Sequence, residues 1–188
     1  MATASEINHF WIEETGPKGW FMGGEELDNT IRARFMPDWE EAAEGARGLW
    51  LTDAEGALAY LILTDQFPRN MFRGDGRSFL LDPLARAAAK LAIAQGWDLT
   101  VPEPQRQMFY LPLMHSENLV DQDRSVALHD ARMSGDDRTL HARAHRDVIR
   151  EFGRFPYRND ALGRVSSAAE RAYLDAGGYR LSVERLQS

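Results

Sequence analysis

Hydrophobic side chains recur along nearly the whole chain at the spacing of an amphipathic helix. In the first segment Ile7, Phe10 and Trp11 form one largely aromatic stripe, which Gly16-Pro17 is predicted to end. No segment shows the sustained alternation, rich in β-branched residues, that is typical of a strand. We therefore predict an all-α protein, with helices over residues 4–15, 25–35, 37–50, 54–67, 83–95, 116–133, 137–152 and 166–176.

The stretch 54–67 is apolar nearly all round, which predicts a central, buried helix. Asp82-Pro83 predicts an N-cap followed by proline at the first helical position, and Gly96 a helix stop. Four of the five tryptophans lie in the first 50 residues, a density more typical of a core than of a ligand cage. No linker or low-complexity tract interrupts the pattern, so we predict a single domain over 1–188.

Length and composition exclude several classes of protein. A chain of 188 residues with 44% hydrophobic residues can bury a core without disulfides or a structural metal. It contains no cysteine, which excludes thiol catalysis and cysteine-bound metal clusters. The longest apolar run, 57–63, is far shorter than the ~20 residues of a membrane span. The opening MATASEINHFWIEE has no basic start and holds acids where a signal peptide is apolar, so we expect a cytoplasmic location.

The net charge and its distribution along the chain limit the kinds of partner that the protein is expected to bind. The net charge of −7 disfavours a nucleic-acid binder, because neutralising phosphates needs a basic surface. The charge is uneven: residues 1–137 hold 12 bases and 23 acids, net −11, whereas residues 138–188 hold 10 bases and 6 acids, net +4. The C-terminal quarter is therefore suited to an anionic partner. No nucleotide-binding, kinase or serine-hydrolase motif occurs.

Three strings stand out: LTDQFPRNMFRG (63–74), MHSENLVDQ (114–122) and HRDVIREFGRFPYRN (145–159). Together with the opening FWIEE and Trp20-Phe21, they make the sequence resemble an uncharacterised bacterial family known as a domain of unknown function. The resemblance covers nearly the whole chain and implies an all-helical fold similar to tetratricopeptide-repeat proteins, with no catalytic residues. The sequence departs from the family pattern at Tyr157, where a histidine is expected, and this weakens any acid–base role at that position.

Two of these strings echo each other, since Phe67-Pro-Arg-Asn returns as Phe155-Pro-Tyr-Arg-Asn. Each proline is predicted to stop a helix, so both are expected to be turns, which either cap helix ends or hold an anion. If the two turns face one cavity, Arg69 and Arg158 should lie within about 10 Å of each other. In the first string we expect Asp65 to be a buried anchor paired with Arg69 or Arg73.

The residues around 115–133 offer a second cluster. Ser116 is predicted to be an N-cap and Glu117 a first-turn acid, which needs no functional explanation. Asp123 and Asp130 border the apolar stripe of this helix, and they either take part in acid–base work or reach arginines elsewhere.

The predicted helix 137–152 carries His141 and His145 one turn apart, with Asp137 a turn earlier. Without a firm third ligand this spacing does not make a metal site, and we predict no metal and no cofactor. Both histidines fall on the apolar face, so at least one should be a hydrogen-bonded core histidine. The opposite face carries Arg143, Arg146, Arg150 and Arg154, which is either a solvated surface or a surface for an anionic partner.

These observations favour a noncatalytic, tetratricopeptide-repeat-like binding module for a protein, a peptide or a small anionic ligand, with no nucleic acid or membrane partner. The alternative is a small-molecule enzyme that uses a His–carboxylate pair in an arginine-lined pocket. The sequence does not identify the ligand, and it decides neither whether the protein is an enzyme nor which oligomeric state it adopts. The candidate ligand-binding residues are Asp65, Arg69, Asn70, Arg73, His115, Glu117, Asp121, His145, Arg158 and Asn159.

Overall fold

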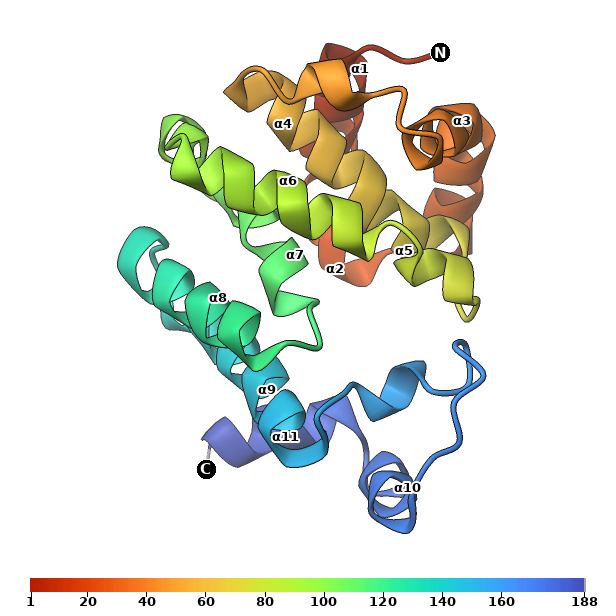
Figure 1. The fold of residues 1–188 in the computed structure, drawn as a ribbon, viewed down its shortest axis with the longest axis vertical. Coiled ribbons are helices and arrows are strands. Elements are labelled where there is room, and N and C mark those ends of the chain that lie inside the picture. Colours follow the sequence, from red (N-terminus) through yellow and green to blue (C-terminus); the bar gives the residue numbers. More distant parts are fainter. Residues whose placement is uncertain (188) are drawn as a thin grey trace. The chain divides into compact units, whose positions relative to one another are not determined.

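The computed structural model describes residues 1–187, except for the side chains of 136–138, and this part of the chain is helical without a strand (Figure 1). The prediction of an all-α protein is confirmed. The α-helices are α1 (Ala4–Asn8), α2 (Gly16–Met22), α3 (Glu25–Ala43), α4 (Ala54–Leu61), α5 (Phe67–Met71), α6 (Asp82–Ala94), α7 (Leu111–Met114), α8 (Leu119–Arg132), α9 (Asp136–Phe152), α10 (Ala168–Asp175) and α11 (Tyr179–Gln187). Segments His9–Thr15 and Ile62–Gln66 are π-helical, and 3₁₀ turns cover Gly48–Trp50, Gly76–Phe79, Trp97–Thr100, Gln105–Phe109 and Pro156–Arg158.

The chain divides into two compact units, Met1–Pro112 (unit 1) and Leu113–Ser188 (unit 2). In unit 1, α1 packs against α4, α3 against α5, and α4 against α6. In unit 2, α9 packs against both α8 and α11. The single domain over 1–188 remains a prediction.

An aromatic cluster forms the core of unit 1. Phe67 is fully buried, and its ring centroid lies 4.8 Å from that of Phe35, 5.5 Å from Trp11 and 5.9 Å from Phe10. Trp11 and Trp39 are themselves buried, as the density of tryptophans predicts. Because Phe67 stands inside the string DQFPRN, this packing also fixes the polar residues on either side of it.

The two helices predicted on either side of Pro37 are one helix, α3, so this prediction is wrong. Proline inside a helix costs about 3 kcal/mol, because it removes a hydrogen bond and its ring crowds the preceding turn. The helix continues because Ile31, Phe35 and Trp39, four residues apart, bury one face together. Their combined burial at about 1.5–3 kcal/mol each exceeds that cost.

The central helix begins as predicted, with the Asp53 side chain accepting from the Gly56 N–H at 2.8 Å, and it is buried. It does not stop at Phe67, however. Residues 62–66 widen into a π-helical turn, in which the Phe67 N–H bonds to the Ile62 carbonyl, and α5 then continues through Pro68. The π-helical turn directly precedes the helical segment that contains Pro68, and such turns are frequent at functional sites.

Glycines at positive φ mark two changes of direction. Gly16, at φ 65°, ends the first helical segment as predicted, but α2 starts at once, because Pro17 is favoured in a first helical turn. Gly153, at φ 71°, ends α9 in the left-handed conformation. The chain then leads into the core of unit 2, which is formed by Val148, Ile149, Phe155 and Tyr173.

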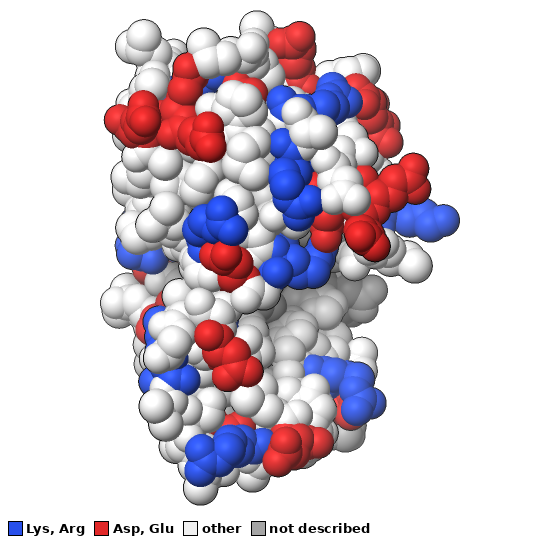
Figure 2. Space-filling view, turned by 90° about the vertical axis from the view of Figure 1, so that its right-hand side faces the viewer, with Lys and Arg blue, Asp and Glu red and all other residues white. Residues whose placement is uncertain are grey.

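Within the described part of the chain, no helix combines the length and the apolar character needed to cross a membrane. Basic and acidic side chains lie beside one another on the face drawn in Figure 2. Within unit 2, Asp123 of α8 pairs with two arginines of α9, since it lies 3.6 Å from Arg146 and 3.2 Å from Arg150.

Candidate functional site

Asp65 and Arg69 form a buried ion pair in unit 1. Asp65 is 1% exposed, and Arg69, one turn later, lies 3.3 Å from its Oδ1 and donates to its backbone carbonyl. The same guanidinium lies 3.0 Å from Asp82. The predicted pairing of Asp65 with Arg69 is confirmed, whereas the predicted cap at Asp82 is wrong, since Leu81 occupies the cap position and Asp82 binds Arg69 instead.

Arg73 belongs to a separate group. Its Nε and Nη2 donate to the two carboxylate oxygens of Asp28 at 2.8 and 2.9 Å, and Asn70 donates to the same carboxylate at 2.8 Å. Burial raises the pKa of Asp28, but the hydrogen bonds from Arg73 and Asn70 outweigh it and hold the pKa below its usual value. These bonds connect α5 and the turn after it to α3. Asp28 is a partner that the sequence analysis missed.

In unit 2, the cap predicted at Ser116 is wrong. Helix α8 begins at Leu119, and Asn118 caps it by accepting from the Val120 N–H at 2.9 Å. Ser116 is buried instead and donates to Asp121 at 2.9 Å. Both residue types cap well, so the local sequence does not distinguish them.

Glu117 consequently stands before the helix. It accepts from the Phe155 N–H and from Arg164, each at 2.9 Å. Burial raises the pKa of Glu117, but these two bonds hold it below its usual value. Glu117 therefore fixes the backbone at Phe155.

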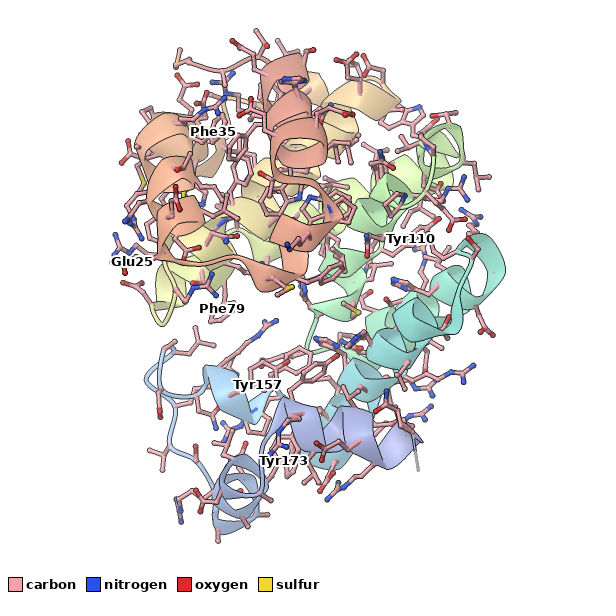
Figure 3. The ribbon with its side chains drawn as sticks, turned by 180° about the vertical axis from the view of Figure 1, so that it is seen from behind. Glu25, Phe35, Phe79, Tyr110, Tyr157 and Tyr173 are labelled. Carbon is pink, nitrogen blue, oxygen red and sulfur yellow. The ribbon has the colours of Figure 1, made fainter. Side chains whose placement is uncertain are left out.

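Three of the predicted residues come together around Phe155 and Tyr179. The ring centroid of His145 lies 4.5 Å from that of Tyr179, 5.6 Å from Phe155 and 6.1 Å from His115. The Arg158 guanidinium lies 4.5 Å over the Phe155 ring. Figure 3 shows Tyr157 and Tyr173, which the Pro156–Arg158 turn and α10 contribute to this unit. We call this group the His–aromatic cluster: His115, His141, His145, Phe155, Tyr157, Arg158 and Tyr179.

A hydrogen bond defines the tautomer of one histidine in the cluster, His145. His145 Nδ1 lies 2.9 Å from the His141 carbonyl, which only accepts, so Nδ1 carries the proton and Nε2 the lone pair. His141 Nδ1 lies 2.7 Å from the Tyr179 hydroxyl. Burial raises the pKa of Tyr179 far above its usual value, with Tyr157 and Tyr173 adding to the effect, so this hydroxyl stays protonated.

His145 is the predicted hydrogen-bonded histidine of this helix. It is half-buried among the rings. Burial first, and then the charges of His115 and Arg158, lower its pKa to about 3. His145 is therefore neutral at physiological pH and presents Nε2 as an acceptor.

Arg158 and Asn159, which follow Tyr157 in the chain, are both buried. Arg158 is 6% exposed, and Asn159 is fully buried with its amide donating to Ser166 at 3.0 Å. The echo between the two strings is not structural, since Arg69 lies within helix α5 and Arg158 in a 3₁₀ turn. They belong to different units, so a cavity shared by them stays a prediction.

The acids that border α8 reach arginines, which is one of the two roles expected of them. Asp130 lies 3.3 Å from Arg143, in addition to the contacts of Asp123. Among the described residues, no group of three or more His, Cys, Asp or Glu side chains is placed to hold a metal ion. The hypothesis of a metal site also involved Asp137, whose side chain is not among those that the structure describes.

The sequence analysis missed Tyr179 because it predicted no helix after Gly177-Gly178. The signal was present: Tyr179, Ser182 and Val183 have helical spacing, and Ser182 is buried with its hydroxyl 2.9 Å from that of Tyr173.

Comparisons with known proteins agree with this architecture. The family described as "Bacterial protein of unknown function (DUF924)" matches residues 7–178. No curated protein matches the chain. Among solved structures, the chain is similar to a protein of unknown function from Agrobacterium tumefaciens, with 41% identity and a TM-score of 0.88 over 93% of this chain and 97% of that chain. The chain therefore belongs to the DUF924 family of bacterial proteins, in agreement with the resemblance carried by its three characteristic strings.

Proposed function

We propose that this protein is a noncatalytic, cytoplasmic binding module of tetratricopeptide-repeat-like architecture, and that it holds a small anionic ligand at the His–aromatic cluster. The observation that carries the proposal is the convergence of His115, His145 and Arg158 around the rings of Phe155 and Tyr179. These residues come from four separate segments of the chain.

The cluster supplies complementary groups for such a ligand. The Arg158 guanidinium provides positive charge for a carboxylate or phosphate. His145 Nε2 accepts a hydrogen bond from a hydroxyl or amide of the same ligand. The rings offer apolar surface. The ligand is therefore a small anion that also carries a hydrogen-bond donor.

The protonation state of His145 favours binding over catalysis. A general acid or base works best with a pKa near the working pH. The pKa of His145, lowered to about 3, is far below it. A neutral imidazole is instead a directional acceptor, which suits recognition.

The test uses lactate and propionate, which share a carboxylate and differ in one hydroxyl. We expect lactate to stabilise the full chain more in thermal melts, with about 2.7 kcal/mol gained at 100 times its dissociation constant. His145→Asn retains a donor for the His141 carbonyl but removes Nε2, so it should abolish the preference for lactate. Arg158→Gln should lose the response to both anions, and Arg158→Lys should retain part of it. The proposal is wrong if neither anion stabilises the wild type, or if Arg158→Gln responds equally.

The second candidate is an enzyme that uses His115 with a carboxylate such as Glu117. The proximity of His115 to His145, 6.1 Å between ring centroids, favours it. Incubation of the protein with each ligand, followed by NMR, separates the two functions. Chemical conversion that His115→Asn abolishes supports the enzyme, whereas an unchanged ligand supports the binding module.

A further inference from the structure

Unit 1 contains a hollow of about 330 Å³ that the proposed function does not use. Arg32 and Met36 of α3 line it, together with Met71, Phe72 and the turn that carries Arg73, Asp75 and Arg77. We call it the arginine pocket. The turn forms because Gly74 adopts φ 81° and the Asp75 side chain accepts from the Arg77 N–H at 2.8 Å. This folding directs both arginines of the turn to one hollow.

Two of the arginines retain donors for a ligand. Arg73 uses Nε and Nη2 on Asp28, and Arg77 uses the same two atoms on Asp75 at 2.9–3.2 Å. A guanidinium has five N–H groups, so each Nη1 keeps two of them for a further acceptor. The side chains of Arg73 and Arg77 are 62% and 59% exposed, so a ligand reaches them.

The pocket is preorganised. Arg32 donates to the Met71 carbonyl through Nε at 3.1 Å and Nη2 at 2.8 Å, which ties α3 to the end of α5. The Arg77 guanidinium lies 4.5 Å over the Phe72 ring, and Phe72 is buried. Side chains that are already held lose little freedom when a ligand binds.

The pocket is positive although the chain is negative. Its lining holds three arginines and one aspartate, net +2, and Asp28 behind Arg73 reduces this to +1, whereas the whole chain carries −7. In Figure 1, α3 and the turn after α5 lie at the right-hand side, which is the side that Figure 2 faces, and there basic side chains gather in unit 1 between acidic ones. A local positive region in a negative protein attracts anions specifically to that place.

We propose that the arginine pocket binds the phosphate group of a small organic phosphate, with the apolar part of the ligand against Met36. A phosphate presents three oxygens to the separate Nη1 groups of Arg73 and Arg77, whereas a carboxylate presents two. Its charge of nearly −2 at neutral pH also matches the pocket better. The volume lies within the range of small-molecule sites. This site is independent of the His–aromatic cluster.

Isothermal titration calorimetry of the full chain with phenyl phosphate tests the proposal, against inorganic phosphate, benzoate and phenol. We expect phenyl phosphate to bind more tightly than the other three compounds. Arg77→Gln removes one pair of free donors and should lower the affinity for phenyl phosphate about tenfold to hundredfold. The loss of a hydrogen bond to a charged group usually lowers an affinity by a factor of this size. Arg180→Gln is the matched control: Arg180 is exposed and paired with Glu184 on α11, and its loss should leave the affinity unchanged.

Several outcomes overturn the proposal. These are equal affinity in Arg77→Gln and wild type, benzoate binding as tightly as phenyl phosphate, and no binding of phenyl phosphate. A loss of affinity in Arg158→Gln rather than in Arg77→Gln would assign the phosphate to the His–aromatic cluster. If circular dichroism shows that Arg77→Gln does not fold, Arg77→Lys replaces it. Lysine keeps the charge but not the planar donor pair, so affinity should fall by a smaller factor, and an unchanged affinity also contradicts the proposal.

Discussion

Replacing His145 with asparagine should make the protein less sensitive to acid. The asparagine amide retains a donor for the His141 carbonyl but does not titrate. In the wild type, protonating His145 places a positive charge among Phe155 and Tyr179 and close to His115 and Arg158. The unfolded chain bears no such cost, so acid favours unfolding.

The size of the effect follows from the two pKa values. The pKa of His145 is about 3 in the folded protein, against 6.5 as its ordinary value. Below pH 6.5 the unfolded chain binds one proton more than the folded chain, so the free energy of unfolding falls as the pH falls, until the pH reaches the folded pKa. Each pH unit in this window costs about 1.36 kcal/mol. The wild type should therefore lose about 2 kcal/mol between pH 7 and pH 5 through His145.

Urea unfolding at pH 7 and pH 5, followed by circular dichroism, measures this loss. The difference between the two pH values should be about 2 kcal/mol smaller in His145→Asn than in wild type. His9→Asn is the control for removing a histidine outside the His–aromatic cluster, because the His9 side chain is 65% exposed and belongs to unit 1. An identical pH dependence in His145→Asn and wild type would refute the reasoning.

Three further predictions concern stability. Asp65→Ala removes a buried carboxylate from Arg69 and should cost about 3 kcal/mol in urea melts, whereas a loss below about 0.5 kcal/mol would contradict the anchoring role. In Gly56→Ala the new Cβ would lie closer than 3.0 Å to the Trp50 carbonyl oxygen, so we expect a loss of about 1–3 kcal/mol, although alanine favours helices. Gly48→Ala, with no neighbour within 4 Å, is its matched control and should be nearly neutral in the same assay. A chelator should leave the melting temperature unchanged, and a fall that zinc or manganese restores would show a metal requirement.

The local sequence predicted helices well where their apolar spacing is regular. The helix expected over 137–152 is α9, Asp136–Phe152, and the buried character of residues 54–67 is present in the fold. Periodicity depends only on neighbours along the chain, so it is readable without the tertiary structure. The same holds for the ion pair of Asp65 and Arg69, which are four residues apart.

Local rules were wrong where long-range burial opposed them. Pro37 was expected to begin a new helix and Pro68 to stop one, yet both lie within helical segments. The burial of Phe35 and Phe67 against each other, with 4.8 Å between ring centroids, requires the helices to continue past the prolines. A rule of proline chemistry contains no information about this packing.

The same distinction between local sequence and long-range packing applies to the candidate site. The sequence by itself determined the helical class, the family and the polar residue types that matter, including His115, His145 and Arg158. Only the tertiary structure decided their neighbours. The Tyr179 hydroxyl forms a hydrogen bond with His141, 38 residues away in the sequence, and Arg32 donates to the Met71 carbonyl, 39 residues away. Helical propensity is a property of adjacent residues, whereas a pKa or a binding pocket depends on groups that only folding brings within a few ångströms. The lowered pKa of His145 and the charge of the arginine pocket are therefore consequences of the packed chain, which its periodicity does not encode.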